Sequence, residues 1–244
     1  MIAAIHRYRG GLHQPRHAHP TMGVTIVLAG SLHERVGSVE ETAHPLSLVI
    51  KPIDVEHENR FGGAGVQTLQ LQLDPDEAAD LARVHASMRR WRWIHCGLFA
   101  RPFLTLARIL AGRDQPAMEL AAADALAAID FPEPLRGSPP AEIRRVKSRL
   151  DDETRPPRVR DLAREAGMHP VYLARLFRRC FGTSMGQYLR RKRIHTVIDC
   201  LGEDRRPLSS VAHQAGFADH AHMCRAFRAE TGMTPSAYQL LLAP

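Results

Sequence analysis

The sequence predicts a mixed fold, with an N-terminal all-β barrel and following helices, and a C-terminal all-α domain with two helix-turn-helix units. Three observations predict it: short β-branched runs near the start, a repeated helical pattern near the end, and a change of charge between them. Residues 1–140 hold 14 Lys and Arg against 15 Asp and Glu, whereas residues 141–244 hold 19 against 11. A basic half indicates a polyanionic partner, and nucleic acid is the commonest one.

The composition excludes several classes of protein. Hydrophobic residues make up 44% of the chain and charged residues 24%, which is typical of a folded globular protein rather than a disordered one. No run approaches the roughly 18 apolar residues of a membrane span, and the first residues lack the apolar stretch of a secretory signal. The cysteines lie far apart without a CxxC pair, which argues against a zinc ribbon or a disulfide scaffold: Cys96, Cys180, Cys200 and Cys224. We therefore expect a cytoplasmic protein without a membrane partner.

Three short runs predict strands in the first part of the chain. Residues 24–29 and 46–51 are rich in β-branched and aliphatic side chains, and residues 66–73 alternate leucine with glutamine. Period-two alternation is typical of a half-buried strand, and Gly and Pro between the runs mark turns. We assign residues 1–75 to a small barrel.

Helical periodicity then replaces the alternation, over residues 76–90, 98–111 and 116–129. Asp74 and Pro75 suit the N-cap and the first residue of the first helix. The third helix carries a predicted apolar stripe, which consists of Leu120, Ala123, Leu126 and Ile129. Such a face packs against the barrel or forms a dimer interface. We assign residues 76–130 to packing and dimerisation, and expect a homodimer.

The Pro-rich segment 131–140, FPEPLRGSPP, predicts a stiff extended linker, because Pro removes the backbone donors that a helix needs. The charge changes at the same place. Residues 141–244 are therefore assigned to a separate DNA-binding domain.

The C-terminal domain contains an internal sequence repeat. Residues 161–189 and 210–239 share a pattern in which Gly167 recurs as Gly216, an offset of 49, and Phe177 recurs as Phe227, an offset of 50. A turn after the glycine can absorb the difference of one residue. A regular repeat predicts one structural unit used twice.

Each unit reads as a short helix, a glycine turn and a second helix with one apolar and one arginine-rich face. The apolar faces comprise Leu173, Leu176 and Phe177 in the first unit, and Met223, Ala226 and Phe227 in the second. The basic faces comprise Arg175, Arg178 and Arg179, and Arg225 and Arg228. A solvated basic face on an ordinary helical bundle is the alternative. Two copies in a basic domain favour recognition helices for the major groove of DNA.

These residues resemble a family. The second unit shows Gly216-Phe217, Asp219, Phe227 and Gly232-Met233-Thr234-Pro235 ahead of Tyr238, and the first shows Leu162-Ala163, Gly167-Met168, Leu173, Phe177, Gly182 and Tyr188. Over about residues 141–241 the chain resembles the AraC-type bacterial transcription regulators. The resemblance implies a non-enzymatic, sequence-specific regulator near the bacterial nucleoid, with double-stranded DNA and RNA polymerase as partners.

A helix over 189–202 would join the two units and set their recognition helices into successive major grooves, about 10 bp apart. By family position, the DNA-facing residues are His169, Pro170, Val171, Ala174 and Arg175 in the first reader, and His220, Ala221, Cys224 and Arg225 in the second. Arg175 and Arg225 suit guanine, and the small apolar residues suit thymine methyl groups. Phosphate is the expected partner of Arg178, Arg179 and Arg228, and Arg193 matches a family arginine on the connecting helix. Two alternatives stay open: His169 and His220 as helix caps, and Cys224 as a small buried hydrophobe.

The front half resembles, more weakly, the cupin-like sensor domain that many members of that family carry. The pattern is His17-x-His19 followed by Pro52-x4-His57. We expect an effector pocket at His17, His19, Glu34 and His57. The same three histidines suit a divalent metal ion, yet Gly23 and Val24 stand where metal-binding cupins place a glutamate. The occupant is thus a metal, an organic effector or nothing. The rival functions are a metal-dependent cupin dioxygenase or isomerase, and a metal-responsive regulator.

Overall fold

The computed structural model describes residues 1–84, 86–95, 100–112, 115–129, 139–152, 157–203 and 207–243. The chain divides into two compact units, and one of them comprises Met1–Phe131, Ile198–Arg206 and Phe227–Pro244. The other comprises Pro132–Val197 and Pro207–Ala226. Most of the predicted linker, 131–138, lies outside the described residues, so the domain boundaries stay predictions. Across the described ranges, no helix combines the length and apolar character of a membrane span.

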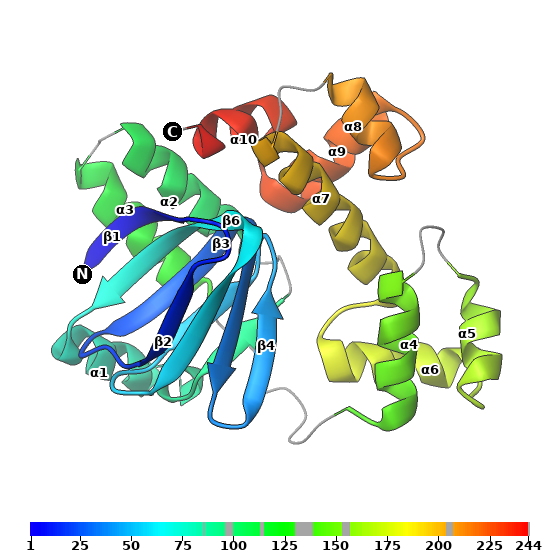
Figure 1. Ribbon diagram of the computed structural model, residues 1–244, viewed down its shortest axis with the longest axis horizontal. Coiled ribbons are helices and arrows are strands. Elements are labelled where there is room, and N and C mark those ends of the chain that lie inside the picture. The colour runs from blue at the N-terminus through cyan, green and yellow to red at the C-terminus, as the bar shows by residue number, and fades with distance from the viewer. Residues whose placement is uncertain are drawn as a thin grey trace. The chain divides into compact units, whose positions relative to one another are not determined.

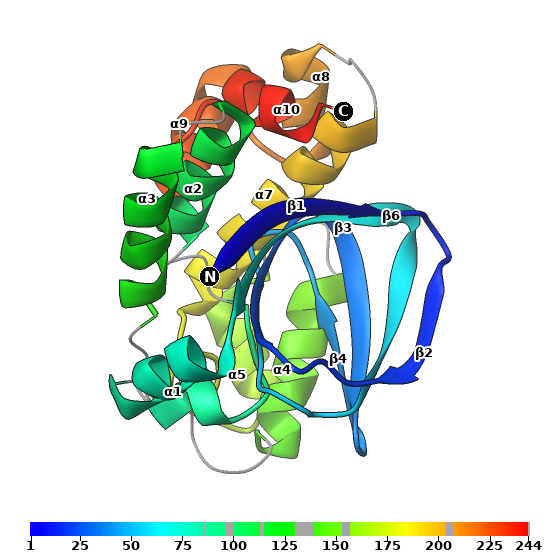
Figure 2. The ribbon, with the colours of Figure 1, turned by 90° about the vertical axis from the view of Figure 1, so that its left-hand side faces the viewer.

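Seven antiparallel strands form one strongly curved sheet in the first unit (Figures 1 and 2). The strands are β1 (Ile2–Tyr8), β2 (His13–His17), β3 (Met22–Val36), β4 (Val39–Ala43), β5 (Leu48–Lys51), β6 (His57–Leu73) and β7 (Arg92–Ile94). Their order is β1-β6-β3-β5-β7, with β2 also paired to β6 and β4 to β3. The all-β fold class predicted for the front half is confirmed, and the three predicted runs lie in or across β3, β5 and β6.

The alternation in β6 separates two environments. Leu69, Leu71 and Leu73 are at most 4% exposed, and they belong to the core. Gln70 and Gln72 project from the opposite face of the strand and line a cavity inside the curved sheet. The polar face of this strand therefore faces an internal cavity.

Four further elements follow the long strands: α1 (Pro75–Val84), the 3₁₀ turn η1 (Ala86–Arg89), α2 (Ala100–Gly112) and α3 (Gln115–Ala127). Asp74 caps α1 as predicted, since its Oδ1 accepts from the backbone N–H groups of Asp76 and Glu77, at 3.1 and 2.9 Å. The side chain of Glu77 accepts in turn from the Asp74 N–H, which completes a capping box. The α-helix predicted to reach residue 90 ends at Val84, where the 3₁₀ turn takes over after one undescribed residue.

The predicted apolar stripe on the third helix is wrong in its register. Leu120 is 68% exposed and Ala123 is exposed, whereas Leu126 and Ile129 are buried as predicted. The buried face also includes Ala121, Ala122 and Ala125. In this alanine-rich helix several faces are nearly equal in hydrophobicity, so spacing alone could not select one.

Seven helices make up the described C-terminal part: α4 (Ala141–Asp152), α5 (Val159–Glu165), α6 (Pro170–Phe181), α7 (Met185–Glu203), α8 (Leu208–Gln214), α9 (His220–Thr231) and α10 (Pro235–Leu242). The predicted connecting helix 189–202 lies within α7. In the first helix-turn-helix unit, Leu162, Leu173 and Phe177 share one hydrophobic cluster with Ile143 and Leu150 of α4. The all-α fold class of this part is therefore confirmed.

Within the compact unit that contains the sheet, α10 contacts the sheet through Tyr238, which is fully buried. Leu28 is the extra residue of a β-bulge in β3, between the paired residues Val27 and Ala29. The Tyr238 hydroxyl donates to the Leu28 carbonyl at 2.7 Å, and the Tyr238 ring packs edge-on against Phe227. The bulge thus presents the Leu28 carbonyl to α10, and the Tyr238 hydroxyl donates a hydrogen bond to it.

Candidate nucleic-acid interface and sensor cavity

Both predicted helix-turn-helix units turn at a glycine in the left-handed region. Gly167 has φ 63° after α5, and Gly216 has φ 74° after α8. A second pair closes the following helices, with φ 67° at Gly182 and 77° at Gly232. Side chains with a Cβ are strained at such angles, so the sequence repeat follows from a repeated backbone geometry.

The two predicted recognition helices, α6 and α9, begin at equivalent caps. At the start of α6, His169 Nδ1 accepts from the Val171 N–H at 3.3 Å. At the start of α9, the Asp219 carboxylate accepts from the His222 N–H at 2.6 Å. His169 and Asp219 are 50 residues apart and therefore occupy the same place in the repeat. The structure places His169 at a cap, whereas His220 is the first residue of its helix.

The two helices also share one burial pattern. Leu173 and Phe177 in α6, and Met223 and Phe227 in α9, are all 0% exposed. Leu176 and Ala226 are half-buried. The exposed members of the predicted DNA-facing set are His169, Val171, Ala174, Arg175, Arg178, Arg179, His220, Ala221, Arg225 and Arg228. The half-buried members are Pro170, Arg193 and Cys224.

Arg193 and Cys224 make local contacts. The Arg193 guanidinium lies 5.9 Å from the centre of the Phe217 ring, which is a cation–π distance. The Cys224 sulfur lies 3.2 Å from His220 Nε2, and burial raises the pKa of its thiol. The thiol form therefore dominates at neutral pH, and Cys224 is a small, polarisable, half-buried residue.

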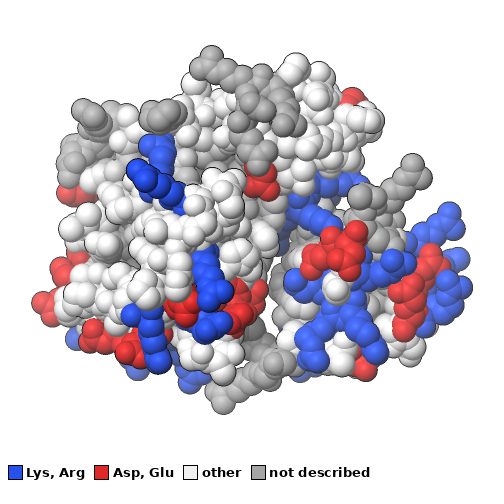
Figure 3. Space-filling model, in the orientation of Figure 1, with Lys and Arg blue, Asp and Glu red and all other residues white. Residues whose placement is uncertain are grey.

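Arginine and lysine side chains gather over the compact unit that contains α4, α5 and α6. Figure 3 shows them crowded around α4, α5 and α6, with acidic side chains in smaller patches between them. Several of these acids are paired locally, such as Asp161 with Arg164 at 3.0 Å and Asp151 with Lys147 at 3.0 Å. Among the described residues, Arg175 and Arg225 make no such pair. Both guanidinium groups are therefore available to an outside acceptor.

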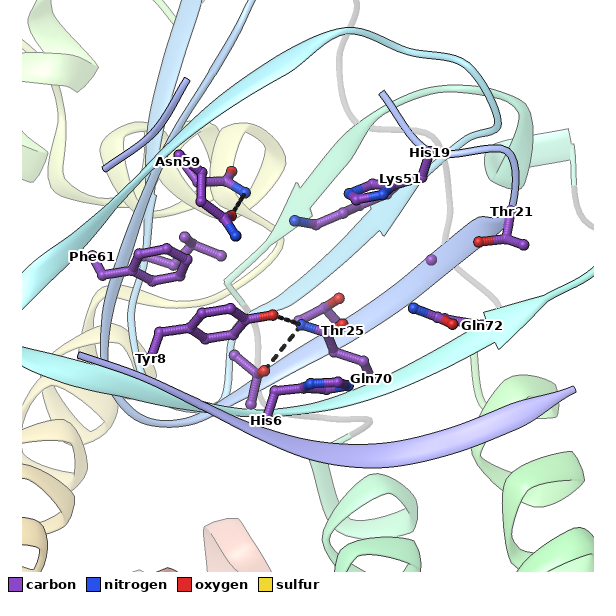
Figure 4. A pocket seen from close by; sticks show the side chains of 14 residues that line it. His6, Tyr8, His19, Thr21, Thr25, Lys51, Asn59, Phe61, Gln70 and Gln72 are labelled. Atoms are coloured by element: carbon purple, nitrogen blue, oxygen red, sulfur yellow. Dashed lines mark hydrogen bonds between the residues drawn. The ribbon is translucent and has the colours of Figure 1, made fainter. Parts of the chain in front are cut away.

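A cavity of about 150 Å³ lies inside the curved sheet (Figure 4). Most of the residues that line it have polar side chains. Gln70 Nε2 donates to the Tyr8 hydroxyl at 3.0 Å and to Thr68 Oγ1 at 3.2 Å. The Tyr8 ring stacks on Phe61, with ring centres 4.3 Å apart, which fixes its hydroxyl toward the cavity. The remaining lining residues include Gln14, His19, Thr25, Lys51, Asn59 and Gln72.

A buried ion pair supports the wall. Lys51 Nζ lies 2.5 Å from Glu34 Oε1, and Glu34 is only 2% exposed. Trp93 Nε1 donates to the second oxygen of Glu34 at 2.7 Å. Glu34 was predicted for the effector pocket, but it is not among the residues that line this cavity. It pairs instead with Lys51, which does line the cavity.

Three histidines meet beside the cavity, as their spacing predicts. His17 and His57 are directly opposed on β2 and β6, with ring centres 4.3 Å apart, and His19 lies 4.9 and 5.2 Å from them. Only His19 of the three lines the cavity. Burial lowers the pKa of His57 to about 4 and also lowers the pKa of His19. Both rings are therefore neutral at pH 7.

Comparisons with known proteins identify the C-terminal region. Residues 162–240 match the model of a helix-turn-helix domain. Over 78 residues the chain is 31% identical to the regulatory protein SoxS of Salmonella typhimurium, which covers 32% of this chain and 73% of SoxS. The chain belongs to the AraC family of transcription regulators.

Other similarities are more limited. The regulatory protein PocR of Salmonella typhimurium is 26% identical over 97 residues, which span 40% of this chain and 31% of PocR. The chain thus spans less than a third of the length of this AraC relative. The structure of ToxT from Vibrio cholerae aligns with 99% of this chain and 98% of its own, at 12% identity and a TM-score of 0.39. That likeness is too weak to transfer any property of ToxT.

Some exposed and cavity-lining residues were not among those predicted from the sequence. Tyr172 is 57% exposed beside Val171 on α6, at the place that His222 occupies on α9. An aromatic residue in the first turn of a predicted basic helix is the sequence feature from which the position of Tyr172 could have been predicted. Tyr8, Lys51 and most other cavity residues were also missed, because they come from strands far apart in sequence. The alternating glutamines of β6 were the sequence feature that could have indicated a polar cavity.

Proposed function

We propose that this AraC-family chain is a sequence-specific DNA-binding regulator that reads two successive major grooves with α6 and α9. The observation that carries the proposal is the duplicated reader, which repeats its turn glycine, its cap and its burial pattern. A helical bundle with an incidental basic face has no need to repeat all three.

The connecting helix has a suitable length. α7 contains 19 residues, which at about 1.5 Å per residue gives about 28 Å. Successive major grooves on one face of B-DNA lie about 34 Å apart. A continuous helix of this length suits a spacer between two readers one turn apart.

The exposed side chains divide into two roles. Arg175 and Arg225 occupy equivalent places in the repeat and suit bidentate contacts with guanine. Arg178, Arg179 and Arg228 lie nearer the helix ends and suit phosphate, which sets position but not sequence. Val171, Ala174 and Ala221 suit thymine methyl groups. His169, Pro170, Arg193, His220 and Cys224 complete the proposed DNA-facing set.

The proposed effector is a small polar molecule bound in the sheet cavity. A cavity of about 150 Å³ is the size that holds one benzene in an apolar protein core, so about six to eight non-hydrogen atoms fit. Hydroxyl, amide and ammonium groups on its wall favour a ligand with several hydrogen-bonding groups. Homodimerisation through residues 98–129 and a contact with RNA polymerase belong to the same proposal. Since the matched relatives are named as regulatory proteins, we do not propose the enzyme alternative.

Selection of bound duplexes from a random DNA library tests this function. We expect the full chain to enrich a motif of two blocks whose centres are about 10 bp apart. Enrichment of no motif above non-specific binding would exclude a sequence-specific regulator. A motif of one block alone would exclude the two-groove part.

A further inference from the structure

The histidine cluster has a donor arrangement that an effector pocket does not require. His17 ends β2, His57 begins β6 directly opposite, and His19 follows two residues after His17. One imidazole nitrogen from each ring lies within 4.8 Å of the other two. Three imidazole nitrogen donors thus converge from two adjacent strands and the turn that follows one of them.

Backbone carbonyls fix the proton on two of the rings. His17 Nδ1 lies 2.7 Å from the Pro15 carbonyl oxygen, and His57 Nδ1 lies 3.0 Å from that of Val55. A carbonyl only accepts, so each Nδ1 carries a hydrogen, and Nε2 is the nitrogen that each ring can offer to a metal ion. Histidines that bind metals usually donate their second N–H to such a carbonyl or a carboxylate. The two rings are therefore oriented as metal ligands are.

The lone pair on His57 has no partner within the described structure. His57 is 1% exposed, and its Nε2 is buried without a hydrogen bond. Leaving a buried polar atom unsatisfied costs about 1–3 kcal/mol, so such an atom calls for an explanation, of which a bound ion is one. A bound cation would satisfy this nitrogen.

The dimensions fit after a small adjustment. An ion at the centre of three nitrogens 4.8 Å apart lies about 2.8 Å from each, and zinc–imidazole bonds are about 2.0–2.1 Å. Each ring therefore has to move by less than about 1 Å. His19 also lines the sheet cavity, so a fourth position opens toward water or a bound molecule. Lys51, whose positive charge acts on His19 and His57, is offset by Glu34 at 2.5 Å.

We propose that His17, His19 and His57 bind one divalent transition-metal ion through one imidazole nitrogen each. Three imidazole nitrogens without a carboxylate favour zinc, nickel or copper over magnesium and calcium, which prefer oxygen. The donor set differs from that of the metal-binding cupins, since Gly23 and Val24 supply no carboxylate. The inference does not depend on the proposed DNA readers.

Calorimetric titration of the untagged, chelator-treated chain with Zn²⁺ tests the site. We expect saturable binding of one ion per chain, weakened at least about 100-fold in H19A. His19 is exposed, so this variant should fold normally, and H33A removes another exposed histidine, outside the cluster, as a matched control. Absence of one-to-one binding, or equal binding by H19A and H33A, would overturn the site.

Tryptophan fluorescence gives a second readout. The Trp91 ring lies 4.6 Å from the ring of His57, so Ni²⁺ in the cluster should quench its emission. In W91F the quenching should fall while the calorimetric binding persists. Quenching of the same size in H19A as in the unmodified chain would place the ion elsewhere. The same samples are also used to select bound duplexes from the DNA library. Loss of metal binding with an unchanged DNA motif would count against the metal site alone, and absence of a motif would count against the proposed function alone.

Discussion

Replacing Arg225 with alanine tests the assignment of α9 as a reader. The side chain is exposed and, among the described residues, has no internal partner, so its removal should leave the free energy of unfolding within about 0.5 kcal/mol of the unmodified value. On DNA, the loss of one bidentate contact with guanine costs about 1–3 kcal/mol, which is about a 5- to 150-fold loss of affinity. The loss should fall on one base pair, because only that contact disappears.

The assay compares binding profiles of R225A, R175A and the unmodified chain across a library of duplexes. R225A should relax one position in one block of the motif, and R175A one position in the other. R83A serves as the control, because Arg83 lies on α1 and pairs with Asp80 outside the DNA-binding region. An unchanged profile for R225A, or a uniform loss at every sequence, would refute the assignment of Arg225 to a base.

Three further predictions concern phosphate contact, the bulge contact and pH. R228A should weaken binding to all sequences alike and reduce the slope of log K against log salt by about 0.9, and an unchanged slope measured across salt would contradict a phosphate contact. Y238F leaves the buried Leu28 carbonyl without its donor, so thermal or urea unfolding should show a loss of about 1–3 kcal/mol; full stability would contradict the hydrogen bond. In the metal-free chain, His57 binds a proton less readily when folded than when unfolded, because its pKa is about 4 instead of 6.5. Its contribution is therefore fully present above pH 6.5 and is lost as pH falls toward 4, by about 3 kcal/mol. Urea titrations from pH 7.5 to 4 should show this loss in the unmodified chain and a smaller one in H57Q, and equal losses would contradict the assignment to His57.

The sequence predicted those features that local chemistry determines. Gly167 and Gly216 are needed where the backbone turns left-handed, so their spacing alone marks the repeated unit. The Asp74-Pro75 pair likewise marks a helix start, because a carboxylate cap acts within one turn. Hydrophobic spacing also identified the buried Phe177 and Phe227 correctly.

Features that depend on tertiary packing were not predictable in the same way. Strand β2 contains Pro15 and several polar residues, and only its pairing with β6 makes it a strand. The cavity is built by residues from five strands, so no single segment of sequence reveals it. The buried face of α3 depends on which alanines meet the neighbouring helix α2, and local spacing selected Leu120 wrongly.

Hydroxyl-radical footprinting of the full chain on its selected duplex tests the proposed double reader most directly. Two protected patches on one face of the DNA, with centres about one helical turn apart, are expected. R175A should weaken protection of one patch and R225A that of the other. A single patch, or loss of the same patch in both variants, would contradict reading by two recognition helices.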